Sequence, residues 1–97
     1  MSALRRLFSS DPDLKHEGRF LLVRVRLPSG EEVPLRISKT SELSPVPEGY
    51  FVRKVIVGPK SLERAVLELT LDRRLRPRRK VLEGAVFVPV REWKHED

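Results

Sequence analysis

Residues 19–37 read RFLLVRVRLPSGEEVPLRI, and the alternation of apolar and polar side chains in this stretch decides the fold class. Apolar residues take every second position on both sides of a central Pro-Ser-Gly, which is the spacing of half-buried strands. We therefore expect an antiparallel β-hairpin. The side chains predicted to face the core are Leu21, Val23, Val25, Leu27, Val33, Leu35 and Ile37.

The length of the central loop decides which residues pair. A two-residue turn would place apolar positions of one strand opposite polar positions of the other. A loop of three residues, 28–30, instead pairs Val25 with Val33 and puts Gly30 in the left-handed third position that such loops favour. We expect this register. Because Pro34 has no amide proton to donate, the second strand is predicted to lie at a sheet edge.

The chain beyond the hairpin keeps a β-like pattern. Residues 38–49 are rich in Ser and Pro and are expected to form a linker loop, since proline forces the residue before it into an extended conformation. Residues 50–57 carry apolar side chains on both faces and predict a central strand. Residues 81–91 predict the last strand, with a bulge or bend at Gly84.

Residues 61–75 are open to two interpretations. A serine at the start, an acid in the first turn and arginines followed by a proline at the end are helix signals. The apolar spacing favours a strand instead, because Ala65, Leu67, Leu69 and Leu71 would then share one face and only Val66 would break the alternation. We expect a strand. The alternative, a helix at 61–75, would make the protein α+β.

The start of the chain predicts a short helix. Within residues 1–18, Asp11-Pro12-Asp13 has the order of a helix start, with an acceptor at the cap and proline in the first turn, and Gly18 would end the helix. The predicted fold is therefore a single small domain over residues 1–97. It is mainly β, with about five antiparallel strands in a curled sheet or open barrel and a short N-terminal helical segment.

Composition restricts the class of protein. The chain has 20 Lys and Arg, 14 Asp and Glu, and no Asn, Gln or Cys. Few heat-labile side chains among many charges are typical of heat-adapted proteins, and the lack of Cys excludes disulfides. No apolar run approaches the roughly 20 residues that a membrane helix needs, and no signal peptide is evident. We expect a cytoplasmic protein without a membrane partner.

The excess positive charge is concentrated in one place. Residues 73–80 read RRLRPRRK and hold six cations, which equals the net charge of +6 for the whole chain. Between two strands this segment would be a basic hairpin loop that attracts a polyanion. We expect non-sequence-specific binding to the backbone of RNA or DNA, with a log–log salt slope of roughly −4 to −5 on duplex DNA. The candidate contacts are Arg73, Arg74, Arg76, Arg78, Arg79 and Lys80, joined by Arg24, Arg26 and Arg53.

Residue patterns for catalysis are scarce. The two histidines, His16 and His95, lie near opposite ends of the chain, and the usual spacings of metal ligands are missing. The sequence offers no cysteine nucleophile and no pair of carboxylates expected to converge in a dry pocket. It therefore predicts no enzyme, no metal, no cofactor and no small-molecule substrate.

A second function class fits the same sequence. A Pro-rich linker, an edge strand at 32–37 and strands with apolar residues on both faces are also expected of a protein-interaction module or a homo-oligomeric subunit. In that case the basic loop would meet an acidic protein partner. A continuous positive surface around residues 73–80 would favour nucleic acid, whereas a large apolar interface would favour the interaction module.

Overall fold

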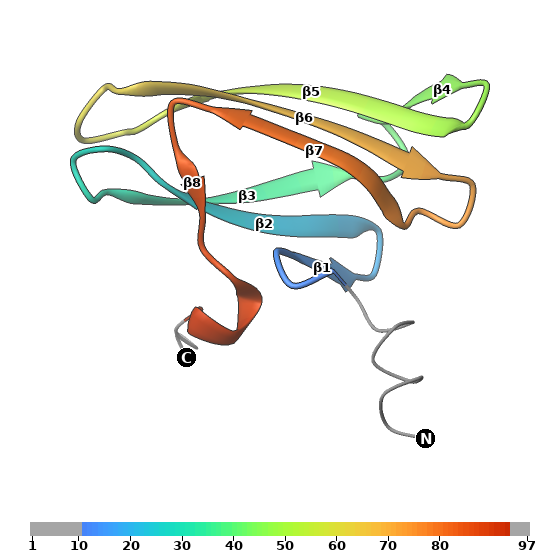
Figure 1. Ribbon diagram of the computed structural model, residues 1–97, viewed down its shortest axis with the longest axis horizontal. Helices are drawn as coiled ribbons and strands as arrows, with labels where there is room; N and C mark the ends of the chain where they lie inside the picture. The colour runs from blue at the N-terminus through green and yellow to red at the C-terminus, as the bar shows by residue number, and fades with distance from the viewer. Residues whose placement is uncertain (1–10, 94–97) are drawn as a thin grey trace.

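The computed structural model describes residues 11–93, which form two antiparallel sheets packed face to face (Figure 1). The first sheet contains β1 (Leu14–Glu17), β2 (Phe20–Arg26), β3 (Glu32–Ser38) and β8 (Val86–Phe87). The second sheet contains β4 (Ser44–Val46), β5 (Gly49–Val57), β6 (Arg64–Asp72) and β7 (Pro77–Glu83). A 3-10 helix, η1 (Val90–Glu92), follows β8. The protein is mainly β, but the described strands form a sandwich rather than a closed barrel.

The β2–β3 hairpin has the register that the loop length predicts. Val25 lies opposite Val33, and the Leu27 amide donates a 2.8 Å hydrogen bond to the Glu31 carbonyl, so that three residues form the loop. Gly30, the third of them, has a φ of 98°. Among the described strands β3 pairs with β2 alone, so its predicted place at a sheet edge is confirmed.

Residues 64–72 form a strand, and the helical alternative for 61–75 is wrong. The side chains of Ala65, Leu67, Leu69 and Leu71 are at most 2% exposed, while the residues between them lie on the outer face. β6 pairs along its whole length with β5, and from Val66 to Leu71 with β7. Burial of every second residue outweighs the local helix signals because only the strand puts all four apolar side chains into the core.

The core lies between the two sheets. Side chains from both inner faces form one hydrophobic cluster, in which the strands of each sheet contribute alternate residues. Its buried members are Leu14, Leu21, Val23, Val25, Leu27, Leu35, Ile37, Val52, Ile56, Ala65, Leu67, Leu69 and Leu71.

The last part of the chain differs from the single strand expected at 81–91. β7 begins earlier, at Pro77, and ends at Glu83. At Gly84, which has a φ of 86°, the chain leaves the second sheet, and β8 pairs with β2 of the first sheet. A Cβ on Gly84 would lie 2.6 Å from the Arg64 carbonyl oxygen, so this crossing requires glycine.

The helix predicted within residues 1–18 is not found in the described part of that segment, 11–18. The Asp13 amide donates a 2.8 Å hydrogen bond to the Asp11 carboxylate, which closes a turn, and β1 starts at once with the buried Leu14. Gly18 lies in the tight β1–β2 turn with a φ of 59°. Residues 1–10 lie outside the described residues. Residues 38–49, predicted to form a linker loop, instead contain the short strand β4.

Candidate nucleic-acid interface

The basic segment is divided between a turn and a strand. Residues 73–76 form the β6–β7 turn, and residues 77–80 already belong to β7, so the loop is shorter than the predicted 73–80. Leu75 has a φ of 66° and packs against the core cluster, which anchors the turn. This strained position persists because burial of the leucine side chain compensates for it.

Asp72, the last residue of β6, stabilises the β6–β7 turn. Its carboxylate accepts hydrogen bonds from the backbone amides of Arg74 and Arg76 at 2.8 and 2.9 Å, and from the Arg76 Nε at 2.9 Å. These bonds, led by the Arg76 amide, lower the pKa of Asp72 below its ordinary value. Within the described residues the Asp72 carboxylate is therefore paired with the Arg76 side chain and not with the side chains of the neighbouring arginines.

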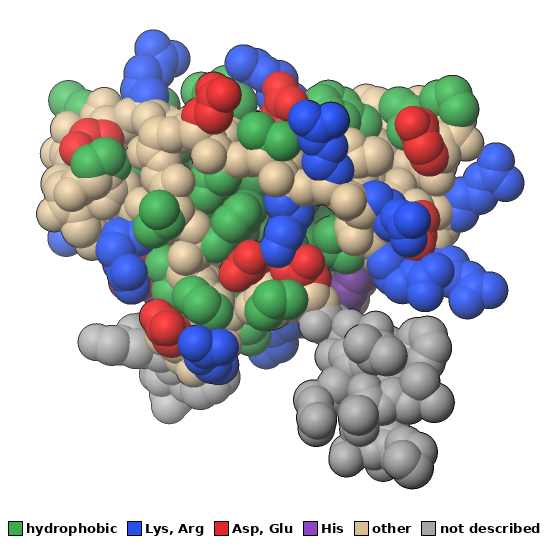
Figure 2. Space-filling view, viewed as in Figure 1, with side chains coloured by type: hydrophobic (Ala, Val, Ile, Leu, Met, Phe, Trp, Pro, Cys, Tyr) green, Lys and Arg blue, Asp and Glu red, His purple; other side chains and the backbone are tan. Residues whose placement is uncertain are grey.

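Four exposed arginines at this end of the molecule have no ion pair with any residue in the range 11–93. They are Arg73, Arg74, Arg78 and Arg79. Within the same range, their only side-chain hydrogen bond joins an Arg73 guanidinium nitrogen to the Pro47 carbonyl oxygen at 3.5 Å. Figure 2 shows blue side chains gathered at the end of the sandwich where Figure 1 places the β6–β7 turn. They form a local surface of positive charge that neighbouring acids do not neutralise.

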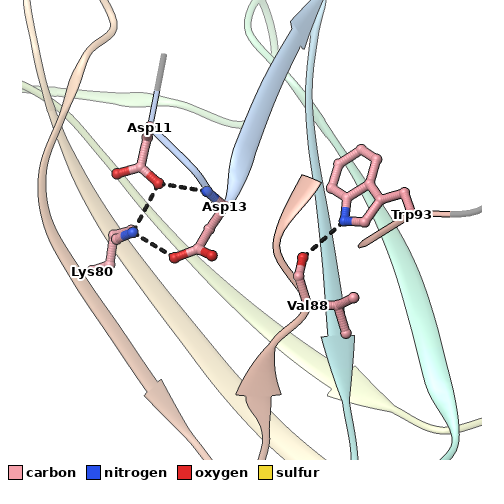
Figure 3. A network of polar contacts seen from close by, with 5 residues as sticks. All are labelled: Asp11, Asp13, Lys80, Val88 and Trp93. Carbon is pink, nitrogen blue, oxygen red and sulfur yellow. Dashed lines mark hydrogen bonds and ion pairs between the residues drawn. The ribbon is translucent and has the colours of Figure 1, made fainter. Parts of the chain in front are cut away.

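Lys80 does not belong to this surface. It points inward from β7, and its ammonium lies 2.8 Å from the Asp11 carboxylate and 2.7 Å from the Asp13 carboxylate (Figure 3). The ammonium also sits 5.2 Å from the centre of the Phe87 ring. Partial burial by itself would lower the pKa of Lys80, but the bonds to the two aspartates raise it overall. Lys80 therefore joins the second sheet to the start of the first.

The remaining predicted contacts lie on two different faces. Arg53 is on the outer face of the second sheet, the face that also carries Arg79, although it pairs with Glu68 at 3.5 Å. Arg24 and Arg26 are on the outer face of the first sheet and pair with Glu32 at 3.8 and 2.9 Å. The predicted patch is thus divided, because sheet alternation sends these side chains to opposite sides of the sandwich.

Among the described residues, His16 belongs to no cluster of potential metal ligands. His16 is exposed on β1, and partial desolvation followed by the nearby Lys39 lowers its pKa. His95 lies outside the described residues. Within 11–93, no three His, Cys, Asp or Glu side chains converge so that they could hold a metal ion. In the same range, no helix has the length and apolar character needed to cross a bilayer.

A second feature was missed by sequence reasoning. A groove of about 780 Å³ runs over the outer face of the first sheet, where Arg19, Arg24 and Arg36 surround Phe20 and Trp93. The alternation of β2 and β3 signalled that these side chains would face outward, but Trp93 comes from beyond η1. Its place beside β2 depends on the chain crossing at Gly84, so no local pattern could reveal the groove.

Comparison with protein-family models, with curated proteins and with solved structures finds no match to this chain.

Proposed function

We propose that the protein binds the phosphate backbone of nucleic acid without sequence preference through the end of the β6–β7 hairpin. The observation that carries this proposal is the group of four exposed arginines, Arg73, Arg74, Arg78 and Arg79, none of which forms an ion pair within residues 11–93. Arginine presents several donors in a planar fork that can hold a phosphate with two hydrogen bonds. A rigid turn that displays four such groups is suited to a repeating anionic chain.

The geometry also sets the expected strength of the electrostatic attraction. Each neutralised phosphate contributes about −0.9 to the log–log salt slope on duplex DNA. Because Lys80 and Arg76 are engaged by aspartates, four free arginines predict a slope of about −3 to −4. This value is smaller in magnitude than the one expected from the sequence.

The test is a fluorescence-anisotropy titration of labelled RNA and DNA, single- and double-stranded, over a salt series. It compares the unmodified protein with a variant in which Arg73, Arg74, Arg78 and Arg79 are all changed to Ser. A matched control changes four other exposed or half-exposed arginines to Ser: Arg26, Arg53, Arg64 and Arg91. Both variants lose four positive charges. They differ in the location of the charge and in that Arg26 and Arg53 of the control are ion-paired with Glu32 and Glu68.

The expected result is a loss of most of the salt slope in the hairpin variant and a much smaller loss in the control. If both variants bind equally well, or if the unmodified protein shows binding only at very low salt, the hairpin end is not the interface. Binding that discriminates strongly among sequences would also contradict the proposal, because backbone contacts carry no sequence information.

A second function, self-association through β5, is favoured by a separate observation. β4 covers β5 only from Gly49 to Phe51, and the rest of that edge has no partner strand among the described residues. Val55 and Val57 near this edge are 50% and 46% exposed, and Leu62 in the following turn is 70% exposed. An open edge with apolar side chains favours pairing with another strand, here the β5 of a second copy.

Sedimentation equilibrium tests this second candidate. We expect a dimer at micromolar concentration and a monomer when Val55→Lys places a charge on the edge. Val86→Lys, at a 59% exposed position on β8, is the matched control and should leave the dimer intact. A monomer at all accessible concentrations of the unmodified protein rules out self-association by this edge.

A further inference from the structure

The groove on the outer face of the first sheet combines an apolar floor with cationic walls. Phe20 and Leu22 of β2 and Pro34 of β3 supply apolar surface, and Arg19 and Arg36 line the sides with exposed guanidinium groups. The volume of about 780 Å³ falls within the range of small-molecule sites in proteins. The groove is open to solvent in the described structure.

Two of the arginines are placed over aromatic rings. The Arg36 guanidinium lies 4.1 Å from the centre of the Phe20 ring, and the Arg24 guanidinium lies 5.7 Å from the centre of the Trp93 ring. Trp93 is itself held by a 2.8 Å hydrogen bond from its indole nitrogen to the Val88 carbonyl oxygen (Figure 3). A planar group can stack on an aromatic ring or on a guanidinium, so these pairs offer stacking surfaces.

Arg24 carries an unused donor. Its Nε is buried and has no hydrogen-bond partner among the described residues. A buried donor without an acceptor costs free energy, so an acceptor is missing at this point of the groove wall. The Glu32 carboxylate approaches another nitrogen of Arg24 only at 3.8 Å, which is too far for a hydrogen bond, and Glu32 is shared with Arg26.

The charge of the lining points to an anionic ligand. The groove lining contains one carboxylate, that of Glu17, and three arginines, Arg19, Arg24 and Arg36. We infer that this groove binds a nucleotide, a planar base joined to a phosphate, with the base stacked on the pairs that Arg24 and Arg36 form with the aromatic rings. The exposed Arg19 then donates hydrogen bonds to phosphate oxygens, and the Arg24 side chain must turn to bring its buried Nε to them.

The nucleotide satisfies both parts of the lining. A simple inorganic anion would leave the apolar floor and the two aromatic rings without contact, and an uncharged aromatic molecule would leave the donors unpaired. The same chemistry occurs in a free mononucleotide and in one unit of a single strand. The inference does not rest on the proposed function, because the groove and the basic hairpin end use different side chains.

Trp93 makes the test specific, since it is the only tryptophan in the chain and it lines the groove. The tryptophan fluorescence of the full chain is titrated with adenosine 5′-monophosphate, adenosine, inorganic phosphate and a single-stranded hexanucleotide. The same titrations are run on Arg36→Ser and on the matched control Arg64→Ser, which removes an exposed arginine from the other sheet. N-acetyltryptophanamide corrects for absorption by the nucleotides.

We expect saturable quenching by the monophosphate, with affinity at least about tenfold weaker for adenosine, for phosphate and for the Arg36→Ser variant. Arg64→Ser should bind as the unmodified protein does. Amide shifts in a 15N heteronuclear spectrum should map to residues 18–24, 34–36 and 93. Quenching by the hexanucleotide but not by the monophosphate would keep the site and assign its ligand to a single strand.

Three results would overturn the inference: no saturable quenching by either nucleotide, equal quenching in Arg36→Ser and Arg64→Ser, or inorganic phosphate binding as tightly as the monophosphate. The variant with Arg73, Arg74, Arg78 and Arg79 changed to Ser separates the two proposals. It should keep the quenching of Trp93 while losing attraction to duplex DNA. The quenching of Trp93 and the binding of duplex DNA therefore test the two proposals independently.

Discussion

Glu31 and Glu63 join the β2–β3 turn to the β5–β6 turn at one end of the sandwich, because each carboxylate accepts hydrogen bonds from backbone amides of the other turn. The Glu31 carboxylate accepts the backbone amides of Lys60 and Ser61 at 3.0 and 2.9 Å, and the Glu63 carboxylate accepts the amide of Ser29 at 3.1 Å. Each acid thus holds the turn of the opposite sheet. The bonds from Ser61 and Ser29 respectively hold the pKa of Glu31 and of Glu63 below the ordinary value.

This exchange predicts acid lability. The folded pKa of each glutamate lies below its ordinary value of 4.5, so the carboxylates contribute their stabilisation above that pH. The contribution is lost as the pH falls through the folded pKa. Thermal melts followed by circular dichroism from pH 7 to pH 2.5 should show the melting temperature fall in the acid range, and fall less steeply in the double variant Glu31→Gln, Glu63→Gln.

The comparison with this variant is informative because glutamine keeps the shape of the side chain and removes the titratable charge. It also replaces one of the two oxygens with which Glu31 accepts backbone amides, and that loss does not depend on pH. Above pH 5 the variant should melt at a lower temperature than the unmodified protein, and the gap should narrow as the acids protonate. A gap that is independent of pH would mean that the two carboxylates contribute no pH-dependent stability.

Lys80 is expected to matter for stability more than for binding. The Lys80 side chain is 23% exposed, and Lys80→Ala would leave two partly buried aspartates without their cation. Removing one partner from a buried ion pair costs about 3 to 5 kcal/mol, so a partly exposed one should cost about 2 kcal/mol in urea unfolding. Because the pKa is raised above 10.5, this stabilisation is complete below that pH and is lost as the pH rises through the folded value.

Anisotropy at a temperature where Lys80→Ala is folded should show little change in nucleic-acid affinity. A large loss of affinity with unchanged stability would place Lys80 in the interface instead. Replacing Lys80 by Met together with Asp11→Asn and Asp13→Asn should recover part of the stability, because no unpaired charge then remains.

After Gly49 at the start of β5, Gly84 is predicted to be the glycine least tolerant of alanine. Gly84→Ala combines a φ of 86° with a Cβ placed 2.6 Å from the Arg64 carbonyl oxygen. We expect a loss of about 2 to 4 kcal/mol in urea unfolding. Gly30→Ala is the control: its φ is 98° but nothing lies within 4 Å of the added Cβ, so only backbone strain of about 1 to 2 kcal/mol is expected. Equal losses would mean that contact with Arg64 is relieved without cost.

The strand at 64–72 can be tested with two leucines. Leu67→Ala removes a fully buried side chain and should cost about 3 kcal/mol, whereas Leu62→Ala, at a position 70% exposed, should cost less than about 0.5 kcal/mol. A helix would have reversed this order, since Leu62 and Ala65 would share its apolar face and Leu67 would lie opposite. Urea unfolding of both variants measures the difference.

Strand identity and hairpin register were predictable because they depend on neighbours in sequence. The alternation of residues 20–37 set the two faces, and the length of the loop with Gly30 at its third position set the pairing. The same alternation identified the inner face of β6 in spite of helix-like ends. These features require no knowledge of what covers the sheet.

Local signals misled where a distant contact competed with them. Asp11-Pro12-Asp13 has the order of a helix start, yet the two carboxylates bind Lys80, which is 69 and 67 residues further along the chain. Gly84 signalled a bend, but only the position of the first sheet decides that the chain crosses to β2 there. In both cases the deciding partner is close in space and far in sequence.

By itself the sequence determined that the protein is mainly β, which residues of β2, β3 and β6 face the core, and that its excess charge lies in residues 73–80. Only the tertiary structure decided how that charge is used. In the folded protein Lys80 pairs with two aspartates, and Arg24 and Arg53 lie on opposite faces of the sandwich. Trp93 lies beside β2 and completes the lining of the groove. The physical reason is that periodicity is a property of adjacent residues, whereas ion pairing and grooves depend on which sheet faces meet.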